Sequence, residues 1–112
     1  MEAYIVTFSI EINENLKKVY DKVVESIKKL GTEGIWEKGS VLEINKTTFL
    51  VYSHRSRDSI RKLLEDTLEK NQSDGDVLVI EIKSSGWSCH FIGDYAAEKK
   101  IKWIKKYVSG EE

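Results

Sequence analysis

Apolar and polar residues alternate in the first stretch of the chain. In residues 4–12, every second position is apolar: Tyr4, Val6, Phe8, Ile10 and Ile12. The positions between them are Ile5, Thr7, Ser9 and Glu11. This two-residue period predicts a β-strand with one wholly apolar face. The opposite face carries two hydroxyls and a carboxylate, so any chemistry on this strand is expected there.

Two longer stretches have the apolar spacing of amphipathic helices. The first helix is predicted over residues 14–30, with Asn13 as its N-cap and Gly31 as a left-handed residue just after its end. The second helix is predicted to begin after Ser56, a favourable N-cap, and to end near Asn71. Both helices have apolar side chains three and four positions apart, so each is expected to bury one side against a sheet.

A third helix is predicted near the end of the chain. It begins after Asp94, whose side chain is a suitable N-cap, and it ends near Val108. Its apolar seam consists of Ala97, Ile101, Ile104 and Val108. This seam is narrow, so most of the helix surface is polar.

Three further stretches are predicted to be strands. Residues 41–44 and 47–53 flank an Asn-Lys turn and form a hairpin, and Trp36 lies in a candidate short strand before it. Residues 76–83 follow a Ser-Asp-Gly turn and are rich in β-branched side chains. They are apolar enough to predict a central position in the sheet.

The predicted order is strand, helix, strand, strand, helix, strand and terminal helix. Two split strand–helix–strand units predict an α+β ferredoxin-like fold, βαββαβ, whose four-stranded antiparallel sheet has two helices on one face. Residues 1–112 are expected to form one domain, with residues 93–112 as a helical extension. The other sheet face stays open unless the terminal helix or a second subunit covers it. We therefore expect a homodimer through this open face or through an edge strand.

Charge and cysteine content narrow the possible functions. The chain has 112 residues with 18 Lys and Arg against 19 Asp and Glu, so the overall charge gives no sign of nucleic-acid binding, although a local patch stays open. The single cysteine excludes an intramolecular disulfide. No apolar run approaches the roughly 20 residues of a membrane span and no leader opens the chain, which predicts a cytoplasmic protein without membrane contact.

Several stretches, in this order, resemble a known family. They are YIVTFSI, a helix that ends in KKLG, a Trp-bearing hairpin, TTFLVYS, a helix that begins SRDSIRKLL, and DGDVLVIEI followed by GW. Over roughly residues 3–90 the chain resembles the small ferredoxin-like proteins grouped with the CRISPR-associated spacer-acquisition subunit, once described as an endoribonuclease. That superfamily includes toxin-like members, and the resemblance implies a dimeric ferredoxin-like protein. Ferredoxin-like topology alone hosts many functions.

The resemblance implies an acidic residue that this chain lacks. Members of the family usually carry an aspartate near the end of the first strand, and in nuclease-active relatives a pair of such acids, one per subunit, holds a divalent metal. The matching position here is Ser9, between Phe8 and Ile10. A hydroxyl is a poor ligand for Mg²⁺, which prefers anionic oxygen. We therefore expect neither a cofactor nor catalysis, unless Glu11 replaces the missing acid.

A basic cluster lies where a strand meets the second helix. The sequence SHRSR places His54, Arg55 and Arg57 near the N-terminus of that helix. Free backbone N–H groups and the helix dipole favour anions there, and guanidinium groups add charge with bidentate geometry. A phosphate or nucleic-acid contact is one interpretation. The alternative is a solvated loop whose arginines pair with Asp58 or with nearby glutamates.

The terminal helix is basic and aromatic. Its basic residues are Lys99, Lys100, Lys102, Lys105 and Lys106, and its aromatic residues among them are Trp103 and Tyr107. This composition suits a nucleic acid or an acidic partner, with Lys102 and Lys106 as candidate contacts. The alternative is a solvated helix face with Trp103 packed on the body or on a partner, because cations are common near helix C-termini.

The remaining candidates favour structural roles. Cys89 and His90 are adjacent, so in an extended chain they point to opposite sides and do not form a nucleophile–base pair. Trp36 and Trp87 lie in glycine-containing connections, where they are expected to cover the edges of the core rather than stack on a base.

Three functions remain open from the sequence. The favoured hypothesis is a non-catalytic module that associates with nucleic acid or with a protein partner. The second is a metal-dependent nuclease or toxin that uses Glu11 and Mg²⁺. The third is a purely protein-binding factor of the antitoxin, phage or inhibitor type.

Overall fold

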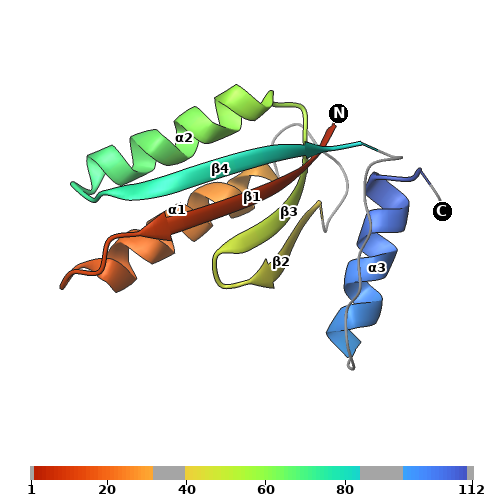
Figure 1. Ribbon diagram of the computed structural model, residues 1–112, viewed down its shortest axis with the longest axis horizontal. Coiled ribbons are helices and arrows are strands. Elements are labelled where there is room, and N and C mark those ends of the chain that lie inside the picture. The colour runs from red at the N-terminus through yellow and green to blue at the C-terminus, as the bar shows by residue number, and fades with distance from the viewer. Residues whose placement is uncertain (1, 32–39, 84–94, 111–112) are drawn as a thin grey trace.

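The chain forms an α+β structure in which one sheet lies between helices (Figure 1). The structure is a computed structural model that describes residues 2–31, 40–83 and 95–110. Its elements are β1 (Glu2–Ile10), α1 (Leu16–Leu30), β2 (Val41–Asn45), β3 (Thr48–Ser53), α2 (Arg57–Lys70), β4 (Gly75–Ile82) and α3 (Tyr95–Tyr107). The four strands pair antiparallel in the order β2-β3-β1-β4. The predicted ferredoxin-like fold with a C-terminal helix is therefore confirmed.

Helices α1 and α2 cover one face of the sheet, as predicted (Figure 1). The alternating pattern of β1 explains why, since its even-numbered apolar side chains all point to that face. The fully buried apolar side chains of this core include Val6, Val23, Ile27, Phe49, Ile60 and Leu64. This core is continuous from the sheet to both helices.

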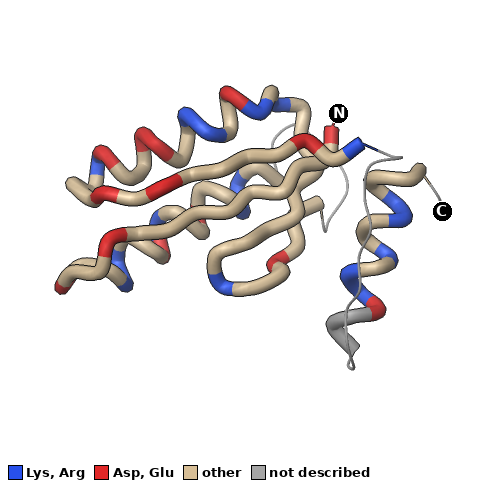
Figure 2. The backbone as a smooth tube through the Cα atoms, in the orientation of Figure 1, with Lys and Arg blue, Asp and Glu red and all other residues tan. Residues whose placement is uncertain are grey.

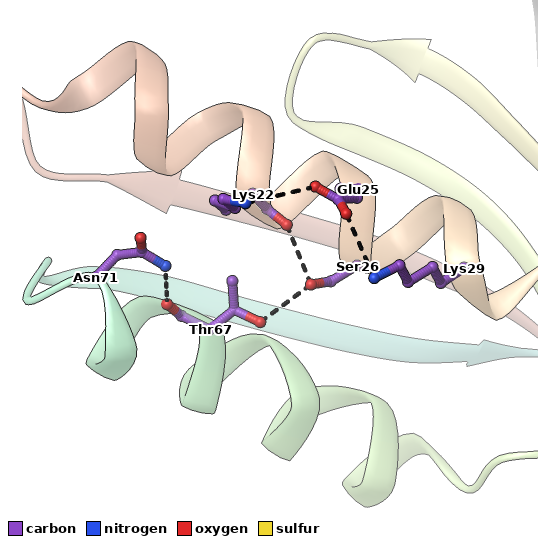
Figure 3. Close-up of polar contacts among 6 residues, drawn as sticks. All are labelled: Lys22, Glu25, Ser26, Lys29, Thr67 and Asn71. Atoms are coloured by element: carbon purple, nitrogen blue, oxygen red, sulfur yellow. Dashed lines mark hydrogen bonds and ion pairs between the residues drawn. The ribbon is translucent and has the colours of Figure 1, made fainter.

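Hydroxyl groups join the two helices above this core (Figure 3). The Ser26 and Thr67 hydroxyl oxygens lie 3.1 Å apart, and the Asn71 amide donates to the Thr67 carbonyl at 2.7 Å. On the outer side of α1, the Glu25 carboxylate lies 3.3 Å from the Lys29 ammonium group and 3.9 Å from that of Lys22. These ion pairs are exposed and add little stability.

Local signals fix both ends of α2. The Ser56 hydroxyl accepts the Ser59 backbone N–H at 3.1 Å, which confirms the predicted N-cap. At the other end, the Leu68 carbonyl accepts the Ser73 N–H at 3.0 Å. Between them, Gln72 has a φ of 53°, the left-handed conformation of a Schellman motif. The turn after α2 is therefore made at Gln72, before the Ser-Asp-Gly sequence.

The connection from β1 to α1 differs from the prediction. β1 ends at Ile10, so Ile12 is not on the covered face and is 86% exposed. Helix α1 begins at Leu16, two residues later than predicted, with Asn15 as its cap residue. The Asn13 side chain instead accepts the Asn15 backbone N–H at 2.8 Å. Asn13 forms a local Asx turn that competes with an earlier helix start.

The residue at the end of α1 also differs from the prediction. Gly31 has a φ of −74°, which is right-handed and not left-handed. A Cβ atom at this position would lie 2.9 Å from both the Ser40 hydroxyl and a Val41 methyl group. Gly31 is therefore required for close packing against the start of β2, and not for its backbone angle.

Helix α3 covers part of the other sheet face (Figure 1). Ala3, Leu50, Trp103 and Ile104 are buried together in a second, smaller core. The Tyr107 ring lies 4.7 Å from the Tyr52 ring and 4.8 Å from the Trp103 ring, measured between centroids. The sequence predicts that the terminal helix or a second subunit covers this face. The terminal helix covers the part near β2 and β3. Trp103 packs on the body of the protein.

Strand β4 lies at an edge of the sheet and not at its centre. The prediction of a central strand is wrong because apolar composition does not reveal strand order. Helix α2 packs on the inner face of β4, which accounts for part of its apolar composition. Leu78 and Ile80, which point to the outer face, are 54% and 47% exposed. An apolar strand with exposed side chains therefore forms one edge of the sheet.

Several predictions fall outside the described residues. These concern Trp36, Trp87, Cys89, His90 and the Asp94 cap. In the part of the chain that is described, no helix is long and apolar enough to cross a membrane.

Candidate nucleic-acid interface

Two helices carry a net positive charge: α1 has +3, from five lysines with Asp21 and Glu25, and α3 has more. Helix α3 contains five lysines and one glutamate, which give a net charge of +4. Because the whole chain has a net charge of −1, the other residues together carry −5. The near-neutral total therefore combines a basic terminal helix with a net acidic remainder, in which Glu25 pairs with two lysines of α1. Such separation produces a local potential that the total charge does not report.

The lysines of α3 lie opposite its apolar side. At about 100° per residue, the side facing the sheet contains Trp103, Ile104 and Tyr107. The opposite arc, about 120° wide by the same rule, contains Glu98 and four lysines. These four exposed residues, which we call the lysine face, are Lys99, Lys102, Lys105 and Lys106. Figure 2 shows that basic residues predominate along this helix. The buried aromatic side thus fixes the orientation of the lysines.

The lysine face is exposed to solvent and makes weak contacts at Lys102 and Lys106. Lys102 lies 3.1 Å from Glu98, but their side chains are 75% and 66% exposed, so this ion pair is weak and exchangeable. The Lys106 ammonium group lies 5.2 Å from the centroid of the Tyr107 ring. A cation above an aromatic ring keeps its full charge. Because its four lysines are exposed, an anion in solution can reach the lysine face.

The second predicted site, at the start of α2, has a structural use for Arg55. The Tyr4 hydroxyl donates to the Arg55 carbonyl at 2.7 Å, and the Arg55 N–H donates to the Ser53 hydroxyl at 3.1 Å. The Arg55 guanidinium donates to the Ser59 hydroxyl at 3.1 Å. These contacts join the end of β3 to the first turn of α2. Arg55 therefore shapes the turn, while His54 and Arg57 remain exposed.

Acidic residues offset the charge near Arg57. The Lys83 ammonium group lies 2.5 Å from the Glu81 carboxylate and, together with Arg57, holds the pKa of Glu81 below its usual value. Burial raises the pKa of the Tyr4 hydroxyl, and the negative charges of Glu81 and Glu2 raise it further. This balance of two cations and two carboxylates makes the start of α2 a weaker anion site than α3.

The structure does not bring all the predicted basic residues together. His54, Arg55 and Arg57 lie at the start of α2, on the helix-covered side of the sheet, whereas Lys102 and Lys106 lie on α3, on the other side (Figure 1). Both groups lie toward the end of the sheet where β1 begins. They are two separate basic surfaces rather than one site.

The predicted acid position lies at the opposite end of β1. The Ser9 hydroxyl donates to the Asp76 carboxylate at 3.1 Å across the β1–β4 pair. Glu11 lies beyond the end of β1, is exposed, and donates its backbone N–H to the Asp74 carbonyl at 2.8 Å. Within the described residues, no three His, Cys, Asp or Glu side chains are placed to hold a metal ion.

Asp76 is a residue that the sequence analysis missed. It follows the Ser-Asp-Gly turn, and only the register of β4 against β1 brings its carboxylate beside Ser9. The alternation of β1 and β4 contains this signal, but it needs the strand order as well.

An open apolar hollow lies at the same end of the molecule. It has a volume of about 490 Å³, and its apolar lining consists of Phe8, Ile10, Leu16 and Tyr20. The Tyr20 hydroxyl donates to the Lys46 carbonyl at 2.7 Å across its rim. This hydrogen bond joins α1 to the β2–β3 turn, so Tyr20 has a structural role at the hollow.

Comparisons with protein-family models, curated proteins and solved structures found no match to this chain. The resemblance to the CRISPR-associated superfamily therefore stays a prediction. The geometry of α3 is the feature that best indicates a function.

Proposed function

We propose that this protein is a non-catalytic module that binds the phosphate backbone of a nucleic acid through the lysine face of α3. The observation that supports this proposal is the separation of charge, with +4 on α3 and −5 on the rest of the chain. Helix α1 also has a net charge of +3, but its Glu25 pairs with Lys22 and Lys29, whereas four lysines of α3 share one exposed arc. We therefore expect α3 to be the preferred contact for a polyanion.

The spacing of the lysine face suits a phosphate backbone. From Lys99 to Lys106 the helix rises about 10.5 Å, at about 1.5 Å per residue. This length corresponds to roughly three nucleotide steps of about 3.4 Å. Lysines act as point charges on flexible stems, so they follow phosphates without reading bases. The expected binding is therefore sensitive to salt and indifferent to sequence.

We also propose that the protein is a cytoplasmic homodimer and that it is related to the CRISPR-associated superfamily. Two copies carry two lysine faces, and a nucleic acid that reaches both gains affinity because the second contact is intramolecular. His54 and Arg57 are secondary contacts in this proposal, because both are exposed at the same end of the sheet as α3.

Fluorescence anisotropy with labelled single-stranded DNA, RNA and duplex DNA at low salt tests this function. The variant Lys102→Gln/Lys106→Gln removes two charges from the lysine face. Its control, Lys18→Gln/Lys28→Gln, removes two exposed charges from α1 on the other side of the sheet. We expect the α3 variant to bind on the order of tenfold more weakly and the α1 variant to bind like the wild type.

Two outcomes would contradict the proposal. One is an absence of binding by the wild type to every oligonucleotide at low salt. The other is an equal loss of affinity in both double variants, which would show only a general effect of net charge. Retention of a specific acidic protein by the wild type, with no nucleic acid, would indicate the protein-binding alternative instead.

A further inference from the structure

The two edges of the sheet differ in how they are protected. At one edge, β2 has five residues and its pairing with β3 is interrupted between Glu43 and Asn45. At the other edge, β4 has eight residues paired with β1 without interruption. Natural proteins usually blunt a sheet edge with a short strand, a bulge, a proline or a charge in the middle of the strand. Between Val77 and Ile80, β4 has none of these.

The backbone of β4 offers hydrogen bonds on its outer side. The Glu11 N–H bonds to the Asp74 carbonyl, so by antiparallel alternation the even-numbered residues of β4 bond to β1. The N–H and C=O groups of Val77, Val79 and Glu81 therefore point away from β1. Within the described residues, no strand pairs with this side of β4.

Exposed apolar side chains lie along the same edge. Leu78 and Ile80 are two of the three large apolar residues that are exposed in the described part of the chain. Within the described residues, the core beneath α3 includes residues of all four strands but not Leu78 or Ile80. Exposed apolar side chains beside free backbone groups are a template for pairing with another strand.

We propose that a second copy of this chain pairs its β4 antiparallel with this β4, which makes one continuous eight-stranded sheet. With the two-fold axis at Val79, Leu78 lies opposite Ile80 of the partner subunit, and the reverse holds by symmetry. The exposed apolar residues of the two copies then cover one another. This pairing specifies the homodimer included in the proposed function but uses none of the α3 lysines.

The sequence of β4 favours a second copy in the antiparallel arrangement, because its exposed apolar centre pairs with itself and its acidic start is kept away from its own kind. β4 is preceded by Asp74 and begins with Gly75 and Asp76, and it is followed by Lys83. Antiparallel pairing about Val79 places Asp76 opposite Ile82 of the partner subunit and keeps the acidic starts of the two strands at opposite ends of the pair. Parallel pairing would instead place the acidic ends together.

Sedimentation velocity of the full chain over a wide concentration range tests this interface. The wild type is expected to move from 12.9 kDa toward twice this mass as concentration rises. Ile80→Lys puts a charge on the edge, and Val79→Pro removes an outward N–H that β1 does not use. Both variants are expected to stay monomeric with an unchanged circular dichroism spectrum. Ile12→Lys is the matched control because it changes a more exposed apolar residue away from β4, and it should dimerise like the wild type.

A wild type that stays at the monomer mass at every concentration would overturn the inference. A dimer that survives in both folded β4 variants would overturn it as well. Neither result bears on the lysine face, because a monomer that binds oligonucleotides through α3 would contradict the homodimer and still support nucleic-acid binding by α3.

Discussion

The two faces of the sheet differ in how completely they are covered. Among the described residues, twelve buried side chains form one core beneath α1 and α2, whereas four form the core beneath α3. The larger core therefore supplies most of the stability of the domain. The smaller core holds a basic helix in place, and beside it Leu78 and Ile80 of β4 remain exposed. The face that contributes less to folding is the one whose surface is available for partners.

The largest predicted effect is in the core beneath α1 and α2. Ile27 is fully buried on α1, and Ile27→Ala leaves a cavity that the packed surroundings cannot fill. We expect a loss of about 3 kcal/mol in the free energy of unfolding, measured by urea denaturation. Ile12→Ala is the control, with a change within about 0.5 kcal/mol because Ile12 is exposed. Equal effects in the two variants would contradict this view of the core.

Truncation of a buried side chain of α3 should destabilise only that helix. Trp103 is 6% exposed and contacts the sheet in the smaller core, so Trp103→Ala is expected to release α3 while the rest of the fold remains. Hydrogen exchange should show faster exchange by about tenfold or more in α3 and unchanged protection in α1 and α2. Uniform loss of protection in all three helices would show that the two cores unfold as one unit.

An intermediate effect is predicted at Tyr4, which anchors the turn before α2. Tyr4→Phe leaves the Arg55 carbonyl without its 2.7 Å hydrogen bond and should lower stability by about 1–2 kcal/mol. The raised pKa of the Tyr4 hydroxyl means that its contribution is present below about pH 10 and is lost as pH rises through the folded-state value. Above about pH 10, the free energy of unfolding should therefore fall less steeply with pH in the variant than in the wild type. An identical alkaline transition in both proteins would contradict this assignment.

The smallest effect is predicted at the Glu81–Lys83 ion pair. The pKa of Glu81 is lowered chiefly by its hydrogen bond with Lys83, so its contribution is present above about pH 4.5 and is lost as pH falls through the folded-state value. Glu81→Gln should narrow the stability difference between neutral and acidic solution, and added salt should reduce the effect because the pair is partly exposed. A variant with the same acid dependence as the wild type would contradict this prediction.

The sequence predicted those parts of the fold that depend on local signals. Helix α2 was located by the Ser56 cap and an unbroken apolar stripe, both of which are properties of neighbouring residues. The start of α1 was misplaced because Asn13 and Asn15 are equally good cap residues, and only the Asn13 side-chain contact separates them. The edge position of β4 was missed because apolar composition does not reveal strand order.

The candidate site was predicted only in part, because its geometry depends on long-range contacts. The lysines of α3 are visible in the sequence, but their common orientation depends on Trp103 packing against the sheet. Asp76 meets Ser9 only through the register of two strands that are far apart in sequence. Arg55 is predicted as a possible ligand contact, and its contacts with Ser59 and Tyr4 add a structural role that the sequence did not indicate.

The salt dependence of oligonucleotide binding tests the central claim most directly. Each lysine that neutralises a phosphate of duplex DNA contributes about −0.9 to the slope of log affinity against log salt concentration. If all four residues of the lysine face make such contacts, a slope of about −3 to −4 is predicted for the wild type and one shallower by about 2 for Lys102→Gln/Lys106→Gln. A flat wild-type slope, or the same slope in both proteins, would contradict the assignment of nucleic-acid binding to α3.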